Sequence, residues 1–338
     1  KAKFYFRLVK PRRSTRPKHL AVRLFLGTLL YVIAPHLSVE AARVDVQGEW
    51  LSVDGERFLV KGVGYAPYRP GQVPWKDEAS LATLEGDFAK IRAAGFNTIR
   101  TWKPLSPAAL ELAKRHGLHV LHGVWVDPEG DYASPAFREM VAQLVRQEVE
   151  RVKAHENVLA VLIGNELSPR QIAQVGVRQA NELLGFAYQA AKAADAGRLL
   201  SHANWPQASL LDASVWDLVS FNVYPYEPAS VSHTFGFRGY VEHLVHTVAR
   251  GRPLLVTEVG LSVSPTASDR PGYGGHTLES HARDVVALWD AVFQAGAQGG
   301  SVFEWSDEWW KQGDYRGDEQ VHDPADPEEW FGLMAFHS

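Results

Sequence analysis

From residue 44 onward, short apolar runs rich in β-branched residues alternate with longer segments of helical periodicity. This alternation predicts βα units arranged around a parallel sheet. Eight runs are predicted as strands: 58–65, 97–102, 119–126, 158–166, 199–204, 218–224, 253–260 and 300–305. Helices are predicted for 80–94, 106–116, 135–155, 170–194, 237–249 and 277–295, and glycines end several of them (Gly95, Gly117, Gly251).

The positions of the polar residues favour a closed barrel over an open sheet. An open doubly wound sheet also alternates strands and helices, but it spreads its functional residues along one crevice. In this chain, polar and aromatic residues stand at the C-terminal ends of separate strands, where a barrel gathers its active site. They are Arg100, His122, Asn165, Glu166, His202, Asn204, Asn222, Tyr224, Glu258, Glu304 and Trp305. We therefore expect an α/β fold, a (β/α)8 TIM barrel.

The two ends of the barrel region depart from this repeat. Before the first strand, the segment "VDVQGEWLSVDGERFLVKG" contains Asp54-Gly55, a strong turn signal, and predicts a short β-hairpin lead-in. After the last strand, the acidic segment "HDPADPEEW" shows no clear helical period. We expect the eighth helix to be short or missing.

The first 43 residues differ from the rest in charge. Residues 1–44 hold ten Lys or Arg and a single acid, Glu40. An apolar run at 20–34, interrupted by Arg23, and then small residues follow the basic start, an order typical of a secretory signal or short membrane anchor. The alternative is an amphipathic helix packed on the domain. We therefore divide the chain into a signal-like or anchor-like segment, 1–43, and a barrel domain, 44–338, which we expect outside the cytoplasm.

Composition excludes several classes of protein. The chain of 338 residues has no cysteine, so it has no disulfide, thiol nucleophile or cysteine-bound metal. Beyond residue 44 there are 25 Lys or Arg and 38 Asp or Glu, a balance that disfavours nucleic acid as a partner. Phosphate-loop, dinucleotide and HExxH motifs are absent from the sequence, so we expect no cofactor and no metal.

Two glutamates at strand ends suit the cleavage of a glycosidic bond. That reaction needs one carboxyl group to protonate the leaving oxygen and another to attack or to activate water. Glu166 ends the fourth predicted strand in "VLIGNE", and Glu258 ends the seventh in "PLLVTEVG". The same dipeptide recurs as Asn181-Glu182 inside a helical segment, where we expect a solvated surface pair. Strand-end position therefore distinguishes Glu166.

This set of residues resembles glycoside hydrolase clan A, whose members carry Asn-Glu on the fourth strand and a nucleophilic Glu on the seventh. The lead-in "WLSVDGERFLVKGVGYAPY" is similar to the barrel start of family 2 and of β-glucan-active relatives such as families 5 and 17. The resemblance implies that Glu166 is the acid/base and Glu258 the nucleophile of a retaining enzyme. It extends to Arg100 in "FNTIRTW", Tyr224 in "SFNVYPY" and Trp305 in "SVFEWSDEWW".

The resemblance also assigns roles around the two glutamates. Arg100 is expected to hold Glu258 ionised, and Tyr224 to donate a hydrogen bond to it. Asn165 is expected to bind the sugar 2-hydroxyl, and Trp305 to form the floor of the sugar site. A structural ion pair would explain Arg100 without catalysis, and aromatic packing would explain Tyr224.

Other polar and aromatic residues suggest an extended glycan cleft. The chain has eleven tryptophans, and Trp102 and Trp125 stand near strand ends, where rings can stack on sugar faces. His122, His202 and Asn204 are candidate sugar contacts and fit buried structural positions equally well.

The sequence thus predicts a retaining β-glycoside hydrolase or transglycosidase that acts on a β-glucan-type oligo- or polysaccharide. Two other enzymes fit the same residues: a β-mannan-active enzyme and a family 2-like exo-glycosidase. A non-catalytic glycan-binding barrel and a structural protein of the cell envelope are the alternatives from other classes.

Overall fold

The structure is a computed structural model that describes residues 44–266, 272–311 and 323–335. Eight parallel strands close into a barrel in the order β10-β11-β4-β5-β6-β7-β8-β9. They are β4 (Val60–Gly64), β5 (Thr98–Arg100), β6 (His119–Val124), β7 (Val158–Asn165), β8 (Leu200–Asn204), β9 (Val219–Asn222), β10 (Leu254–Val259) and β11 (Gly299–Val302). The predicted TIM barrel is confirmed: seven predicted strands enclose an observed strand, and β11 begins one residue before the predicted range 300–305.

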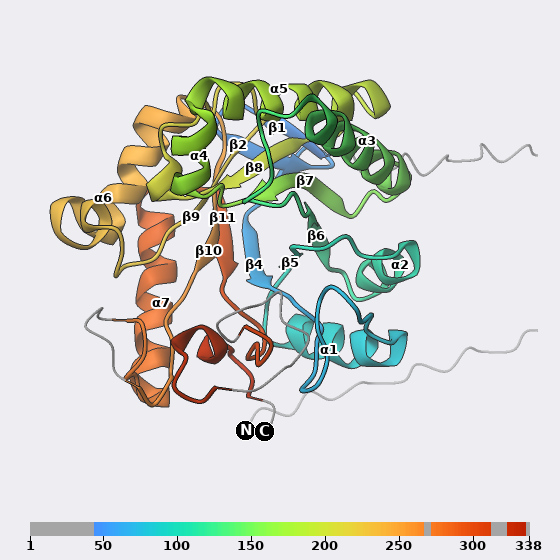
Figure 1. The fold of residues 1–338 in the computed structure, drawn as a ribbon. Helices are drawn as coiled ribbons and strands as arrows, with labels where there is room; N and C mark the ends of the chain where they lie inside the picture. The colour runs from blue at the N-terminus through green and yellow to red at the C-terminus, as the bar shows by residue number, and fades with distance from the viewer. Residues whose placement is uncertain (1–43, 267–271, 312–322, 336–338) are drawn as a thin grey trace, which may run out of the picture. The chain divides into compact units, whose positions relative to one another are not determined.

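Helices connect the strands and cover the outside of the barrel (Figure 1). They are α1 (Leu81–Ala93), α2 (Pro107–Arg115), α3 (Pro135–Val152), α4 (Pro169–Val175), α5 (Val177–Ala194), α6 (Gly236–His243) and α7 (Leu278–Gln294). A serine or threonine side chain caps the first turn of most of them, accepting from a backbone N–H: Ser80, Ser106, Ser134, Ser168 and Thr277. Proline at the first position of α2, α3 and α4 fixes the same starts.

The helix predictions were wrong in detail at two places. The predicted helix 170–194 is two helices, because Gly176 adopts a φ of 87° that breaks the α-helical path between α4 and α5. The predicted helix 237–249 changes after α6 to π-type hydrogen bonding over Leu244–Ala249. After β11 the described residues form only a short 3-10 turn, Pro327–Trp330, so they contain no eighth α-helix.

The lead-in forms a small antiparallel sheet of β1 (Val44–Gln47), β2 (Trp50–Val53) and β3 (Glu56–Arg57). Asp54 and Gly55 both have positive φ, 56° and 81°, as a tight two-residue hairpin turn requires. Leu51 is fully buried among the leucines and valines inside the barrel. Figure 1 shows β1 and β2 at the end of the barrel where β4 begins, away from its arrowhead.

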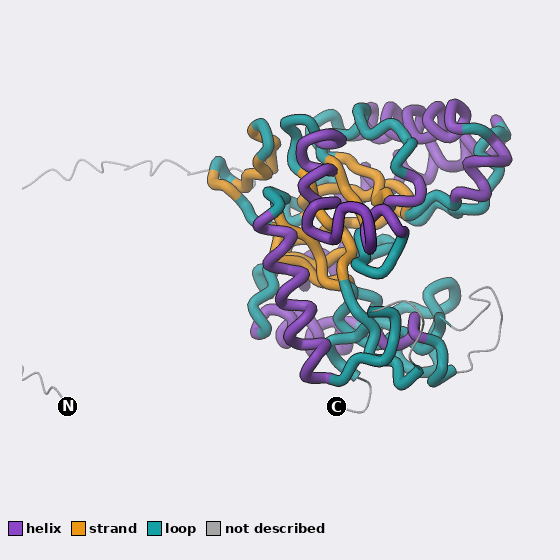
Figure 2. The backbone as a smooth tube through the Cα atoms, turned by 90° about the vertical axis from the view of Figure 1, so that its left-hand side faces the viewer, coloured by secondary structure: helices purple, strands orange, loops and turns teal. Residues whose placement is uncertain are grey.

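Apolar side chains form separate layers inside and outside the barrel wall. Leu121, Leu162 and Leu255 belong to the cluster inside the barrel, whereas Val161 and Val256 pack outward toward helices. Burial on both faces explains why these strands read as continuous apolar runs. In Figure 2 the loops that follow the strands gather at one end of the barrel. The catalytic candidates lie at this end.

The predicted signal or anchor, 1–43, lies outside the described residues. In the part of the chain that the structure describes, no helix is both long and apolar enough to span a bilayer.

Candidate active site

Glu166 directly follows β7 and Glu258 lies near the end of β10, both at the loop-rich end of the barrel. Each strand carries one extra residue just before its glutamate. Three residue steps on β7, from Leu162 to Asn165, match two on β8. Two steps on β10, from Val256 to Glu258, match one on β9. Both strands therefore contain β-bulges next to the candidate catalytic residues.

The bulges change which way the side chains point. Strict alternation would turn Glu258 outward with Leu254 and Val256, which pack against helices. The extra residue instead aims its carboxylate into the barrel mouth. On β7, Gly164 has a φ of 72°, which glycine adopts without strain, and Asn165 then points inward.

Three donors surround the carboxylate of Glu258. Its Oε1 accepts the indole N–H of Trp102 at 2.9 Å and lies 3.0 Å from an Arg100 guanidinium nitrogen. Its Oε2 accepts the Tyr224 hydroxyl at 2.8 Å. Arg100 and Glu258 are both buried, 1% and 5% exposed. Arg100 also stacks on the Trp102 ring, with 3.8 Å between the guanidinium carbon and the ring centroid.

Glu166 has a different environment. Its Oε1 accepts one hydrogen bond, from the Asn222 amide at 2.8 Å. The same Asn222 nitrogen lies 3.1 Å from Oδ1 of Asn165, which also accepts from Arg100. Thr257 donates to Oδ1 of Asn222 at 2.8 Å and so fixes the orientation of this amide. A chain of hydrogen bonds thus connects the two glutamates across four strands.

These surroundings separate the acidities of the two glutamates. Burial and the negative charge of Glu258 raise the pKa of Glu166 to about 8. Burial also raises the pKa of Glu258, but the cations Arg100 and Lys311 and the hydrogen bond from Tyr224 oppose that rise. Two carboxyl groups with divergent environments are the usual arrangement of an acid paired with a nucleophile.

Two residues of this site were not in the predicted set of catalytic and binding residues. Asn222 ends β9, and its position two residues before Tyr224 at a strand end was the available signal. Lys311 lies in the loop after β11, where its ammonium sits 3.0 Å from Glu308 and 3.5 Å from Glu328. The sequence does not indicate that Lys311 belongs to the site, because its partner Glu328 lies in a later segment, after residue 322.

The structure places Phe303, and not the predicted Trp305, against the aromatic donors to Glu258. Trp305 is 5% exposed and belongs to the apolar cluster between the barrel and its helices. Phe303, two residues earlier, packs edge-on against Trp102 and Tyr224, the two aromatic donors to Glu258. The ring beside the nucleophile candidate is therefore Phe303. Trp125 follows β6 and is 41% exposed.

The remaining candidates lie on the outer side of the barrel wall. His122 is fully buried and faces Glu148 of α3 at 3.8 Å. Asn204 binds the carbonyl of Ala208 and the N–H of Trp205, so it shapes the loop after β8. Of the two alternatives left open for His122 and Asn204, the structure fits the buried structural position, because alternation along β6 and β8 turns their side chains away from the mouth.

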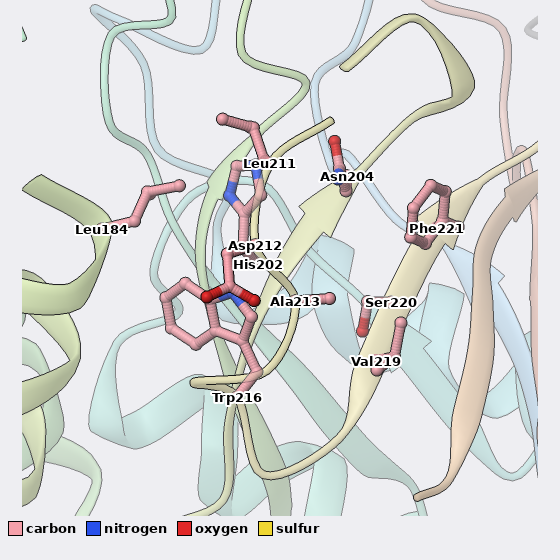
Figure 3. A pocket seen from close by; sticks show the side chains of 10 residues that line it. All are labelled: Leu184, His202, Asn204, Leu211, Asp212, Ala213, Trp216, Val219, Ser220 and Phe221. Atoms are coloured by element: carbon pink, nitrogen blue, oxygen red, sulfur yellow. The ribbon is translucent and has the colours of Figure 1, made fainter. Parts of the chain in front are cut away.

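His202 also takes the buried structural position, the second of its two predicted alternatives. Its Nδ1 lies 2.8 Å from the carbonyl of Ile163, and its ring stacks near that of Trp216. Figure 3 shows both side chains lining a cavity of about 10 Å³, the size of one water molecule. Burial lowers the pKa of His202 to about 4, so the ring is neutral at pH 7. It supports β7 from outside the barrel.

Within the described ranges, no group of three or more His, Asp or Glu side chains is arranged to hold a metal ion.

Comparisons with known proteins agree with this fold. No family model matches the chain. The solved β-galacturonidase of family 2 from Eisenbergiella tayi, bound to galacturonate, is similar at a TM-score of 0.66 and 19% identity, over 86% of this chain and 52% of that one. The β-glucuronidase of Ruminococcus gnavus is similar at a TM-score of 0.67 and 17% identity, over 87% of this chain and 50% of that one. The fold expected from the clan A resemblance is thus confirmed.

A curated sequence is also similar over part of the chain. β-Galactosidase 2 of Enterobacter cloacae is 26% identical over 142 residues, 38% of this chain and 14% of that protein. The chain therefore spans about half the length of the solved relatives and a smaller share of the curated one.

Proposed function

We propose that this chain is a retaining β-glycoside hydrolase or transglycosidase that works through a covalent glycosyl-enzyme intermediate. The observation that carries the proposal is the unequal surroundings of the two glutamates. Glu258 receives three donors, one of them a cation, and Glu166 receives one neutral donor and has a pKa raised to about 8. In the proposed mechanism Glu258 therefore acts as the anion and Glu166 supplies the proton.

The geometry supports a double displacement. A carboxylate oxygen of Glu258 attacks the anomeric carbon while the glycosidic C–O bond breaks and Glu166 gives its proton to the leaving oxygen. Glu166, now ionised, takes a proton from water or from a sugar hydroxyl. That oxygen attacks the anomeric carbon and releases Glu258, so two inversions give net retention.

Asn165 is suited to hold the sugar 2-hydroxyl. Its Oδ1 accepts from both Arg100 and Asn222, which fixes the amide and leaves Nδ2 to donate elsewhere. A hydrogen bond at this hydroxyl strengthens in the transition state.

The proposed substrate is a β-linked glycan of the β-glucan type, as the lead-in and the aromatic residues near the mouth suggest. A family 2-like exo-glycosidase is the second candidate, because the solved relatives with this fold are family 2 β-galacturonidases and β-glucuronidases. The products formed from β-1,2, β-1,3, β-1,4 and β-1,6 glucans distinguish these two candidates. Release of single sugars from chain ends supports the exo-glycosidase.

Trapping tests the mechanism directly. A 2-deoxy-2-fluoro β-glycoside with a good leaving group should label the protein once, and mass spectrometry of peptides should place the label on Glu258. Proton NMR should show the β-anomer as the first product. A label on another residue, or an α-anomer formed first, would contradict the proposal; the latter implies carboxyl groups about 6.5–9.5 Å apart instead of about 5 Å.

We also propose an extracytoplasmic location, with attachment or export directed by residues 1–43. Cell fractionation of the full chain tests this: recovery only in the cytosol with that segment intact would defeat it.

A further inference from the structure

A group of carboxyl side chains surrounds Lys311 at the mouth of the barrel. Lys311 lies between Glu308 at 3.0 Å and Glu328 at 3.5 Å, so two carboxylates already share its charge. Glu304 and Glu308 are 1% and 3% exposed. We call Glu304, Glu308, Lys311 and Glu328 the Lys311 cluster.

The Lys311 cluster lies one aromatic layer from the nucleophile. The Lys311 ammonium is 4.4 Å from the centroid of the Phe303 ring. Phe303 in turn contacts Trp102 and Tyr224, which both donate to Glu258. The Phe303 ring therefore contacts both the Lys311 ammonium and the two aromatic donors to Glu258, and the charges of Lys311 and Glu308 act on that carboxylate.

Glu304 has hydrogen-bonding capacity that the protein does not use. Among the described residues no N–H or hydroxyl group donates to its carboxyl oxygens, and its side-chain hydrogen bond is with the carboxyl group of Glu308. Its Cβ lies close to where a side chain on Gly64 would begin, in the space that Trp102 also borders. A buried carboxyl group without donors is costly unless a bound partner supplies them.

We propose, on the basis of the function proposed above, that the sugar attacked by Glu258 is a neutral glycosyl unit and that the Lys311 cluster excludes uronic acids. Sugar hydroxyls supply the donors that Glu304 lacks. A uronate would bring another anion to a buried place where two carboxylates already surround a single ammonium, and like charges placed together cost several kcal/mol. The proposed preference for a neutral sugar differs from the substrates named for the solved relatives, which are a β-galacturonidase and a β-glucuronidase.

Protonation of Glu304 does not make the Lys311 cluster favourable for a uronate. Burial and the charge of Glu308 raise the pKa of Glu304 well above the usual range, which favours its neutral form. A protonated Glu304 can donate to a uronate, but its side chain is already hydrogen-bonded to Glu308. A neutral hydroxyl can both donate to Glu304 and accept from it.

Rates on four p-nitrophenyl β-glycosides test the inference. The full chain should hydrolyse the glucoside or galactoside with kcat/KM roughly 100-fold above the glucuronide and galacturonide, the loss expected for several kcal/mol. Glu308→Gln removes one negative charge beside the sugar. It should reduce this rate ratio about tenfold, which corresponds to the loss of about 1.4 kcal/mol of repulsion against the uronate. The exposed Glu242→Gln on α6 removes the same charge away from the mouth and should leave the ratio unchanged. A uronide that is turned over as well as the neutral glycosides would overturn the inference while leaving the proposed function intact.

Binding measurements keep the inference testable if turnover fails. Calorimetry on the wild-type protein should show that isofagomine, an imino sugar without a carboxylate, binds more tightly than its uronic counterpart. Tighter binding without turnover of any glycoside would support the sugar preference and contradict the proposed enzyme. Equal or tighter binding of the uronic compound would overturn the preference.

Discussion

The indole nitrogen of Trp102 lies 2.9 Å from Oε1 of Glu258, although 156 residues separate the two in sequence. Trp102→Phe keeps an aromatic ring against Phe303 and removes this donor. We expect kcat to fall by about 10- to 100-fold with a smaller change in KM, at the low end of what one lost active-site donor costs. Steady-state kinetics on an aryl β-glycoside measure it. Trp50→Phe, at the opposite end of the barrel, is the matched control and should change neither constant.

Azide separates the roles of the two carboxyl groups. Glu258→Ala should lose turnover, because no oxygen remains to form the glycosyl-enzyme. Glu166→Ala should keep the first step on substrates with good leaving groups, and added azide should restore its turnover and give a β-glycosyl azide, since azide needs no general base. On Glu258→Ala azide should give the α-glycosyl azide. If the two azide products have the reverse stereochemistry, Glu166 is the nucleophile and Glu258 the acid/base. If both variants keep full activity on a natural glycan, these glutamates are not the catalytic pair.

The pH dependence of kcat/KM should be bell-shaped, with a basic limb near pH 8. Glu166 must be protonated to act as the acid, and its pKa is raised to about 8, so the rate falls as pH rises through that value. Glu258 must be ionised, and its pKa is also raised, so the acidic limb should lie above the ordinary glutamate value of about 4.3. Glu166→Gln, assayed with a good leaving group, should lose the basic limb. A limb that stays near pH 8 in this variant would assign it to another residue.

Gly164 should be essential for the direction of Asn165. Its φ of 72° is left-handed, and a Cβ there would lie 3.4 Å from Nδ1 of His202. Gly164→Ala should lower the free energy of unfolding by about 1–2 kcal/mol and reduce kcat by turning Asn165 away from the mouth. Urea unfolding and kinetics on the same sample test both effects. Gly185→Ala in α5, where a Cβ has no neighbour within 4 Å, should instead be neutral or stabilise by up to about 1 kcal/mol.

The sequence predicts the barrel well because each strand is a local signal. The run "VLAVLIG" of β7 is buried on both faces and bounded by turn residues, so neighbouring segments suffice to place it. The helix that breaks at Gly176 shows the limit of periodicity, which continues across a single left-handed residue. All predicted strands except that of β8 end one or more residues beyond the observed strand, because the polar residues that follow continue the alternating pattern.

The site is less predictable because side-chain direction depends on irregularities that leave no mark in the pattern. His122 and His202 lie within β6 and β8, where regular alternation turns them outward, while bulges turn Asn165 and Glu258 inward. Whether Trp305 or Phe303 lies beside Glu258 likewise depends on the direction of the side chains after β11. Lys311 and Glu328 meet through a segment that returns to the mouth after residue 322, a contact that no local rule predicts.

The backbone of Glu166 has a consequence for how this protein can change over time. Its φ is 46°, a left-handed conformation that costs a residue with a Cβ about 1–2 kcal/mol relative to glycine. Selection for folding alone would therefore replace this glutamate, and an inactive Glu166→Gly protein should melt at a higher temperature than the parent in calorimetry. Activity and heat resistance are opposed at this single position. A copy of the barrel that has lost its reaction can consequently gain stability by one substitution, whereas regaining activity would require giving that stability up.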